Sequence, residues 1–383
     1  MNVQITSKLP HVGTSIFSVM SRLAVEHKAI NLSQGFPDFD VPQTLRERVS
    51  HYMNEGFNQY APTVGIPYLR EQVALKIAKL YNRNVSSEHE VTITCGATAA
   101  LYTTINTVVN PGDEVILFDP AYDSYRPVVE VNGGKTVHIP MLPPDNATDW
   151  DKVRDNISDK TRLIIINTPH NPTGSLLSKG DVDTLAEIVR DTNILLLSDE
   201  VYEHVVFDGL SHHSMLCHDE LAERSFVVSS FGKTYHATGW KLGYCVAPKH
   251  LSQEFRKIHQ FVTFSVVTPI QYAYADYMEN HPEHYLNLPQ FYQHKRDHFC
   301  NLLKDSRFSL TPAKGTFFQL VDYSHISGKN DEDFARYLTC EVGVACIPVS
   351  VFYDEKPDSH IIRFCFAKDN STLQKAAEIL CKI

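Results

Sequence analysis

Short apolar runs alternate with segments of helical periodicity through the first part of the chain. Six runs are short, apolar on both faces and rich in β-branched or aliphatic residues: 91–94, 114–118, 162–167, 193–198, 225–229 and 242–247. Segments between them, such as 98–109 and 181–191, repeat apolar residues at helical spacing. Doubly apolar strands that alternate with helices predict a parallel or mostly parallel α/β sheet covered by helices on each side.

The pattern changes beyond about residue 270, where long helical stretches precede isolated strands. The sequence predicts these elements in order: helices over 268–278 and 286–305, a strand over 316–322, a helix over 331–343, a strand over 361–367 and a helix over 371–382. Such a mixture is typical of an α+β domain. We therefore expect a large α/β domain over 41–275 and a smaller α+β domain over 276–383, with residues 1–40 as an arm contributing to the smaller domain.

Polar and small residues follow four of the predicted strands. The segments are 95-CGAT-98, 168-TPHNPTG-174, 199-DEVYEH-204 and 230-SFGKT-234. Each alone has an ordinary explanation, because Asn, Pro and Gly dominate turns and an Asp often caps a helix. GKT is not a P-loop, since Val227 stands where that motif needs Gly. Ligands of open α/β sheets bind beyond the carboxyl ends of strands, so the four segments together predict one site.

Composition narrows the partners and the compartment. The chain has 383 residues and a formal net charge of −10, with no run rich in Lys or Arg, which argues against nucleic acid or anionic membrane as the main partner. The N-terminus lacks a signal-peptide pattern, and no apolar run is long enough to span a membrane. Eight scattered cysteines contain no CxxC and 19 histidines make no HExxH, so we expect a reduced cytoplasmic protein without a metal site.

Four motifs together give the chain a family resemblance: 171-NPTG-174, 198-SDEVY-202, 229-SSFGKT-234 with a second lysine at position 241, and the late arginine at position 363. With them, the chain resembles the class I aminotransferases, pyridoxal-phosphate (PLP) enzymes of fold type I, from residue 31 to residue 373. The stretches QGFPDF, NQYAP, FDPAYDSY and HQFVTFS are most similar to the methionine and kynurenine aminotransferase branch. The resemblance implies a mostly parallel seven-stranded sheet in the large domain and a homodimer with shared active sites.

The resemblance also implies catalytic roles. Lys233 matches the lysine that links covalently to PLP, which must be neutral to attack an aldehyde and therefore belongs in a sequestered pocket. Asp199 matches the carboxylate that keeps the pyridine nitrogen protonated, so that the ring accepts electrons. Asn171 and Tyr202 match donors to the ring's phenolate oxygen, and Tyr122 matches the aromatic residue stacked on the ring.

Other matched residues contact the cofactor phosphate. Ser230 and Lys241 match phosphate ligands, and the helix start at 96-GAT-98 fits the same phosphate through its backbone N–H groups and helix dipole. This assigns Gly96, Ala97 and Thr98 to the cofactor site. Tyr60 matches a residue that reaches the phosphate of the neighbouring subunit.

A third group of matched residues concerns the substrates. Arg363 matches the bidentate clamp on the substrate α-carboxylate, with Asn171 beside it and the Gly35 backbone N–H near the same group. Phe17, and Phe264 from the partner subunit, match pocket-lining positions. Kynurenine aminotransferases commonly carry Trp at position 17, a larger aromatic at position 98 and His at position 265, where this chain has Phe, Thr and Ser. No Arg stands in these segments to bind a distal carboxylate, so aspartate is not expected as the main donor.

These features favour a methionine transaminase. It would also accept aromatic amino acids, with histidine, glutamine and kynurenine as further candidate donors and a 2-oxo acid as acceptor. A PLP-dependent C–S β-lyase acting on cysteine conjugates is the alternative, because the cofactor carries the hard step in both reactions. A non-enzymatic regulator on the same fold would need an added DNA-binding region, for which the chain has neither the length nor a basic patch.

Overall fold

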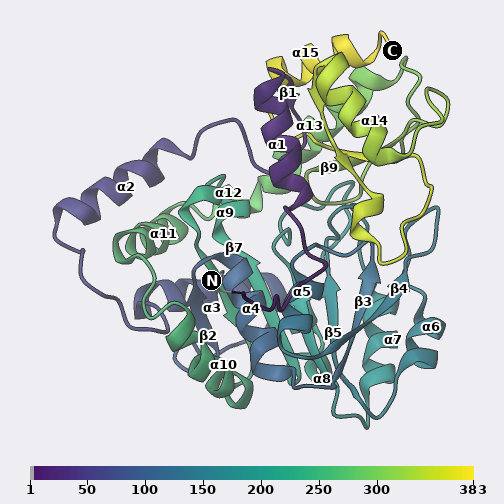
Figure 1. The fold of residues 1–383 in the computed structure, drawn as a ribbon. Helices are drawn as coiled ribbons and strands as arrows, with labels where there is room; N and C mark the ends of the chain where they lie inside the picture. Colours follow the sequence, from purple (N-terminus) through teal and green to yellow (C-terminus); the bar gives the residue numbers. More distant parts are fainter. Residues whose placement is uncertain (1–3) are drawn as a thin grey trace.

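A seven-stranded sheet forms the centre of the computed structural model, which describes residues 4–383 (Figure 1). Its strands lie in the order β2-β8-β7-β6-β5-β3-β4. They are β2 (Val91–Thr94), β3 (Glu114–Asp119), β4 (Lys135–Pro140), β5 (Thr161–Asn167), β6 (Leu195–Asp199), β7 (Ser225–Ser230) and β8 (Gly243–Val246). β8 runs antiparallel to both of its neighbours, whereas the other neighbouring strands pair in parallel, so the sheet is mostly parallel as predicted.

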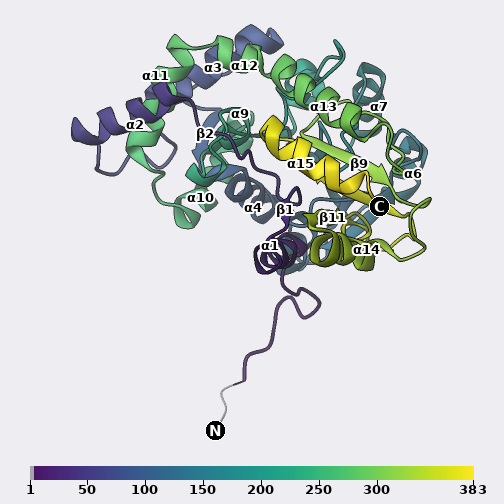
Figure 2. The ribbon, with the colours of Figure 1, turned by 90° about the horizontal axis from the view of Figure 1, so that it is seen from above.

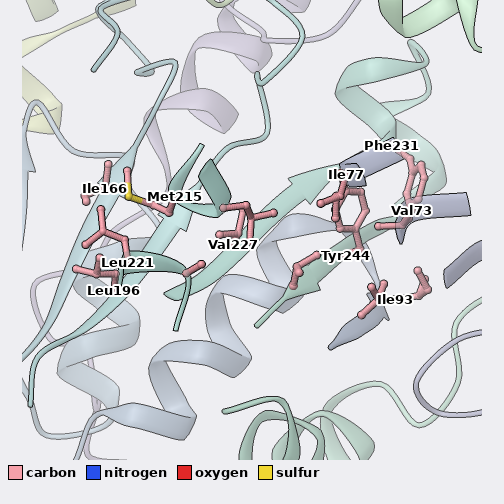
Figure 3. Close-up of a cluster of buried hydrophobic side chains, with 14 of the residues drawn as sticks. Val73, Ile77, Ile93, Ile166, Leu196, Met215, Leu221, Val227, Phe231 and Tyr244 are labelled. Carbon is pink, nitrogen blue, oxygen red and sulfur yellow. The ribbon is translucent and has the colours of Figure 1, made fainter. Parts of the chain in front are cut away.

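Helices bury both faces of this sheet. One face packs against α4 (Gly96–Val108), α5 (Tyr125–Val131) and α10 (Lys249–Val262). The other packs against α3 (Pro67–Tyr81), α6 (Trp150–Asn156), α7 (Lys179–Val189), α8 (Asp219–Ala222) and α11 (Thr268–Asn280). Because successive strand residues point to opposite faces, Val227 belongs to one apolar cluster and Val228 to the other. Figure 3 shows Val73 and Ile77 of α3 near Ile93 and Tyr244.

A third apolar cluster joins the beginning of the chain to its end. Met20 of α1 (Ile16–Glu26) and Leu32 pack with residues between Leu288 and Leu380. The elements there are β1 (Ile30–Asn31), α12 (Glu283–Leu286), α13 (Leu288–Leu303), β9 (Phe318–Asp322), α14 (Asp331–Tyr337), β10 (Val344–Ala345), β11 (Ile347–Pro348), β12 (Ile361–Cys365) and α15 (Asn370–Leu380). The strands among them form a three-stranded sheet of order β11-β12-β9 and the parallel pair β1-β10.

Two segments extend from this body. Helix α2 (Gln43–Asn54) projects to one side and packs mainly on α11 (Figure 1). The exposed residues before α1 lead away from the rest of the chain (Figure 2). The first three residues of the arm predicted over 1–40 lie outside the described residues.

Nearly all predicted elements occur in the structure, with differences in extent and direction and with one strand of the central sheet that the apolar pattern does not predict. The edge strand β4 was not predicted, and β8 runs against its neighbours. The helix predicted over 331–343 is α14 followed by a π-helical turn, Leu338–Val342. Within residues 4–383, no helix is both long enough and apolar enough to cross a membrane.

Candidate active site

A cavity of about 290 Å³ collects most of the predicted site residues. The predicted residues that line it are Phe17, Gly35, Gly96, Ala97, Thr98, Tyr122, Asn171, Asp199, Tyr202, Ser230, Lys233, Lys241 and Arg363. Tyr60 and Phe264 are the two predicted residues that do not line it in this single chain. The cavity lies at the carboxyl ends of the parallel strands, the position expected for ligands of an open α/β sheet.

The direction of β8 explains how Lys241 reaches this edge. Asp199 ends β6 and Ser230 ends β7, so both lie at the carboxyl ends of parallel strands. β8 starts at Gly243 and pairs antiparallel with β7, with Ser230 opposite Gly243. An antiparallel strand begins where its parallel neighbours end. Lys241, two residues before β8, therefore lies at the same edge as Asp199 and Ser230.

Lys233 lies on the four-residue helix α9 (Phe231–Thr234), which follows β7 directly. Its Nζ donates a hydrogen bond to the Gly35 carbonyl oxygen at 2.8 Å and has no carboxylate within ion-pair distance among the described residues. Burial lowers the pKa of Lys233 from 10.5 to about 8, and the nearby Arg363 and Lys241 cations act in the same direction. The site therefore offers a lysine amine that is far more easily deprotonated than an exposed one.

Asp199 is buried with one carboxylate oxygen well satisfied and the other not. Oδ2 accepts a hydrogen bond from the Tyr125 hydroxyl at 2.7 Å, whereas Oδ1 has only a 3.4 Å contact with the Val201 backbone N–H. Burial raises the pKa of Asp199 to about 6, against the effect of the Tyr125 hydrogen bond. A cationic N–H facing Oδ1 would complete this carboxylate, so Asp199 fits the protonated pyridine nitrogen of PLP.

Asn167 connects Asp199 to Asn171. Its side-chain Nδ2 donates to the Asp199 backbone carbonyl at 2.9 Å, and its Oδ1 accepts from the Asn171 backbone N–H at 2.7 Å. Asn171 in turn accepts a hydrogen bond from Arg363 through Oδ1 at 2.7 Å. One side chain thus fixes the backbone of two predicted cofactor contacts.

The part of the cavity that is lined by Gly96, Ser230 and Lys241 is suited to an anion. Gly96 begins the 13-residue helix α4 with φ +74°, and a Cβ there would lie 3.3 Å from Cε of Lys241. At Gly243 a Cβ would lie only 2.7 Å from the Ala97 backbone nitrogen. The first N–H groups of a helix have no partner within the helix, and Lys241 forms no ion pair with any residue in 4–383. Free N–H groups, Lys241 and Ser230 fit a phosphate group.

Arg363 on β12 is fully buried yet borders the cavity. Nη1 donates to Asn171 Oδ1 at 2.7 Å and Nη2 to the Ser33 carbonyl at 3.1 Å, while Nε has no partner within residues 4–383. Its guanidinium lies 3.8 Å from the ring centroid of Phe318, and burial lowers the pKa of Arg363 to about 10. A guanidinium with an unsatisfied N–H next to a cavity can bind a carboxylate.

Gly35 and Phe17 are held by their surroundings. A Cβ at Gly35 would lie 2.7 Å from the Phe318 ring, so a larger residue there would require this ring to move. Gln34 donates through Nε2 to the Phe17 carbonyl oxygen at 2.9 Å, which ties α1 to the loop before Phe36. Tyr122 packs edge-on against Tyr125 with ring centroids 5.6 Å apart.

Tyr60 and Phe264 lie on the surface of the chain. Their side chains are 82% and 59% exposed, and their rings meet edge to face at 5.1 Å. Phe264 has φ +58°, a conformation that bulky residues adopt at a cost of about 1–3 kcal/mol. Exposed apolar side chains that lie together are typical of a binding surface.

Tyr125, Asn167, Gln34 and Phe318 were not predicted as site residues. Tyr125 and Gln34 lie inside the quoted stretches FDPAYDSY and QGFPDF, so their neighbourhood was available as a signal. Asn167 ends β5 as Asp199 ends β6, and the strand-end rule would have included it. Phe318 carries no local signal.

Comparisons with known proteins agree with this geometry. The family model for aminotransferase class I and II matches residues 27–380. Methionine aminotransferase from Escherichia coli is 50% identical over 98% of this chain and 97% of its own length. The solved structure of YbdL from Escherichia coli, reported with a methionine aminotransferase function, superposes with a TM-score of 0.98 at 49% identity, covering both chains completely.

Two further relatives act on other amino acids according to their names. A probable N-succinyldiaminopimelate aminotransferase from Mycobacterium tuberculosis is 35% identical over 97% of this chain and 96% of its own. Kynurenine–oxoglutarate transaminase from Dictyostelium discoideum is 35% identical over 97% of this chain and 94% of its own. With these matches over almost the whole chain, the protein belongs to the class I and II aminotransferases, PLP-dependent enzymes that act on amino acids and 2-oxo acids.

Proposed function

We propose that this aminotransferase transfers the amino group of methionine and of aromatic amino acids to a 2-oxo acid. The observation that carries the proposal is the composition of the cavity. Among the described residues that line it, Arg363 is the single guanidinium, and the rings of Phe17, Tyr122 and Phe318 form apolar walls. The 50% identity to methionine aminotransferase supports the same donor.

The proposed roles of the residues follow from the contacts above. When bound, PLP supplies an electron sink for the electron pair that remains when the donor loses its Cα proton. Lys233 Nζ would hold the cofactor at rest and, once free, would take up and return that proton. Asp199 Oδ1 would stabilise a proton at the pyridine nitrogen, and the hydroxyl of Tyr202 and the amide of Asn171 would donate to the phenolate oxygen. The phosphate would be bound by Gly96, Ala97, Thr98, Ser230 and Lys241.

Selection of the substrate then rests on one clamp and one pocket. Arg363 binds the α-carboxylate common to all donors, and Gly35 lies beside it. Methionine is flexible and polarisable, so its thioether fits against the aromatic rings of Phe17 and Tyr122. An aspartate side chain would lose its hydration there without a cationic partner, which costs several kcal/mol.

We also propose a homodimer with shared active sites. Tyr60 and Phe264 are exposed in the single chain and lie together, which supports a role at the cavity of a second copy. In that arrangement Tyr60 contacts the partner's cofactor phosphate and Phe264 closes the partner's substrate pocket.

The apolar clusters support a division of the chain into three parts. We propose an arm over 1–40, a large PLP-binding domain over 41–275 and a small domain over 276–383, because Met20 and Leu32 share one cluster mainly with residues from Leu288 onward. Tyr202, Val205 and Phe207 of the large domain join this cluster where the two domains meet. We place the enzyme in the cytoplasm, in keeping with its eight free cysteines.

A panel of amino donors tests the proposal. With a 2-oxo acid present, methionine and phenylalanine should have kcat/KM values at least about tenfold above aspartate, a difference of only ~1.4 kcal/mol. Phe17→Ala should change the ranking of donors, whereas Arg363→Ala should weaken all of them together. Aspartate as the best donor would contradict the proposed pocket. Ammonia and pyruvate released from a cysteine conjugate without any acceptor would instead favour the C–S β-lyase.

A further inference from the structure

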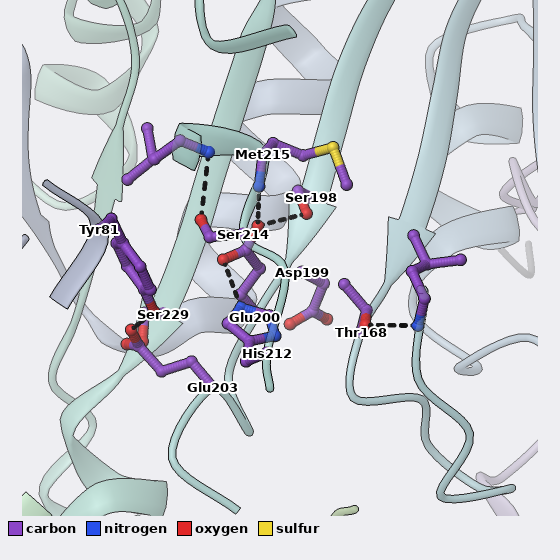
Figure 4. Close-up of polar contacts among 12 residues, drawn as sticks. Tyr81, Thr168, Ser198, Asp199, Glu200, Glu203, His212, Ser214, Met215 and Ser229 are labelled. Carbon is purple, nitrogen blue, oxygen red and sulfur yellow. Dashed lines mark hydrogen bonds and ion pairs between the residues drawn. The ribbon is translucent and has the colours of Figure 1, made fainter. Parts of the chain in front are cut away.

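A second polar cluster lies buried behind the proposed cofactor contacts. We define the Glu203 cluster as Lys76, Tyr81, Glu203, Ser229 and Tyr244. Glu203 is its centre, with a side chain only 3% exposed, and Figure 4 shows Tyr81 and Ser229 meeting at its carboxylate. None of the five residues lines the active-site cavity.

Four donors converge on the one carboxylate. Oε1 accepts from Lys76 Nζ at 2.7 Å, from the Tyr244 hydroxyl at 2.9 Å and from the Ser229 hydroxyl, while Oε2 accepts from the Tyr81 hydroxyl. Three donors therefore reach Oε1 and one reaches Oε2, so both carboxylate oxygens of Glu203 have hydrogen-bond partners. Bonds from three different elements, α3, β7 and β8, hold its position and orientation.

The charge of this carboxylate depends on Lys76. Burial by itself raises the pKa of Glu203, but Lys76 and the hydrogen bond from Ser229 hold it well below its usual value. His204 Nε2 lies 3.7 Å from Glu203, yet burial lowers the pKa of His204 to about 3. The imidazole is therefore neutral and accepts a hydrogen bond from Lys76, so it is not an ion-pair partner of Glu203.

Two members of the Glu203 cluster, Glu203 and Ser229, are sequence neighbours of proposed cofactor contacts. Glu203 follows Tyr202, and Ser229 precedes Ser230. Ser229 pairs with Tyr244 across β7 and β8, and both donate to Glu203. The carboxylate thus joins the turn that presents Tyr202 to the strand ends that present Ser230 and lead into Lys233.

We propose that Glu203 is a positioning residue for the transamination site. Paired with Lys76, its carboxylate fastens the turn after β6 to β7 and β8 and thereby sets the Tyr202 hydroxyl relative to Ser230 and Lys233. This inference rests on the cofactor contacts proposed for Tyr202 and Ser230.

Stability alone gives little reason for such a pair. A buried ion pair replaced by well-packed apolar residues often leaves the free energy of unfolding unchanged or higher. Apolar side chains fill the same space but make no directional bonds, so they cannot fix the orientation of the turn that carries Tyr202. Measurements can therefore distinguish a role in positioning Tyr202 from a role in stability alone.

The test uses the PLP-loaded enzyme and two measurements: kcat for methionine, and the pH midpoint of the visible absorbance of the resting enzyme. In Lys76→Met/Glu203→Leu, both charges and all directional bonds are lost together. We expect kcat to fall by about tenfold to a hundredfold, as displaced catalytic groups do, with a smaller change in KM. The absorbance midpoint should move by at least about half a pH unit, because the contacts to the phenolate oxygen change.

Two further variants keep the test decisive. Ser229→Ala removes one donor to Glu203 and should shift both measurements in the same direction, by a smaller amount, even if the double variant does not fold. Asp208→Asn breaks the ion pair with Arg296, whose Nη1 lies 2.6 Å from Asp208, away from the cavity. This control should lower the melting temperature without moving the absorbance midpoint.

Tyr202→Phe separates failure of this inference from failure of the proposed site. If Tyr202→Phe moves the midpoint while the double variant and Ser229→Ala leave both kcat and the midpoint at wild-type values, the positioning role of Glu203 is overturned. If Tyr202→Phe itself leaves the midpoint in place, the contact assigned to Tyr202 is wrong and the inference falls with it.

Discussion

Lys76 and Lys233 approach the same end of the central sheet, and their amino groups meet different surroundings. Lys76 Nζ lies 2.7 Å from a Glu203 carboxylate oxygen and also contacts Tyr244 and His204. Lys233 Nζ has a single carbonyl acceptor, Gly35, at 2.8 Å, and two cationic neighbours, Arg363 and Lys241. A charged partner stabilises the ammonium form, whereas desolvation next to other cations favours the neutral amine. The surroundings of Lys76 fit a structural ion-pair partner, whereas those of Lys233 fit the nucleophile that we propose.

The largest effect that follows is on turnover. Lys233→Ala should lower kcat by roughly five orders of magnitude, because it removes both the proposed attachment point of the cofactor and the proposed base that moves the Cα proton. The free energy of unfolding of the cofactor-free protein should change by less than about 1 kcal/mol, since no carboxylate loses its partner. Kinetics and urea unfolding measure the two quantities. Turnover within tenfold of wild type would remove Lys233 from the site.

Replacement of Lys76 should lower the stability of the protein strongly, unlike replacement of Lys233. Lys76→Met leaves Glu203 as an unpaired buried carboxylate and should lower the free energy of unfolding by about 3–5 kcal/mol. Lys76→Met/Glu203→Leu should recover most of that loss, because neither charge remains. Urea unfolding of the cofactor-free wild type and of both variants measures these free energies. A loss below about 1 kcal/mol in Lys76→Met, the range of exposed ion pairs, would mean that the pair is not buried as described.

The pH dependence of cofactor attachment distinguishes the buried Lys233 from an ordinary lysine. Below its pKa of about 8, Lys233 is protonated and cannot attack an aldehyde; above it, the amine is free. The rate at which the cofactor-free protein takes up PLP should therefore rise with pH and level off just above 8, and stopped-flow absorbance would record it. A rate that keeps rising to the ordinary lysine value of 10.5 would show that Lys233 is not desolvated.

Much of this fold is predictable from the apolar pattern, and the exceptions have physical reasons. Strands covered on both faces are apolar throughout, which is why six of the seven central strands stand out. β4 lies at the edge of the sheet, where Lys135 is exposed and only Ile139 is fully buried, so its pattern is weak. The direction of β8 is invisible because an apolar run looks the same in either direction.

The residues of the site likewise divide into those that the sequence predicts and those that it does not. Residues at strand ends, such as Asp199 and Lys233, can be predicted because topology alone brings strand ends together. Glu203 sits among them in sequence, yet its role depends on Lys76 and Tyr81, which lie more than 120 residues earlier and reach it only through the packing of α3. Local sequence carries no trace of such long-range contacts.

The contrast between the two lysines is tested most directly by borohydride reduction of the PLP-loaded enzyme, followed by peptide mapping. Reduction makes the lysine–cofactor link permanent. The pyridoxyl group should be found on the peptide that contains Lys233, with Lys76 and Lys241 unmodified. A pyridoxyl group on either of those two lysines, with Lys233 free, would contradict the assignment of Lys233 as the nucleophile.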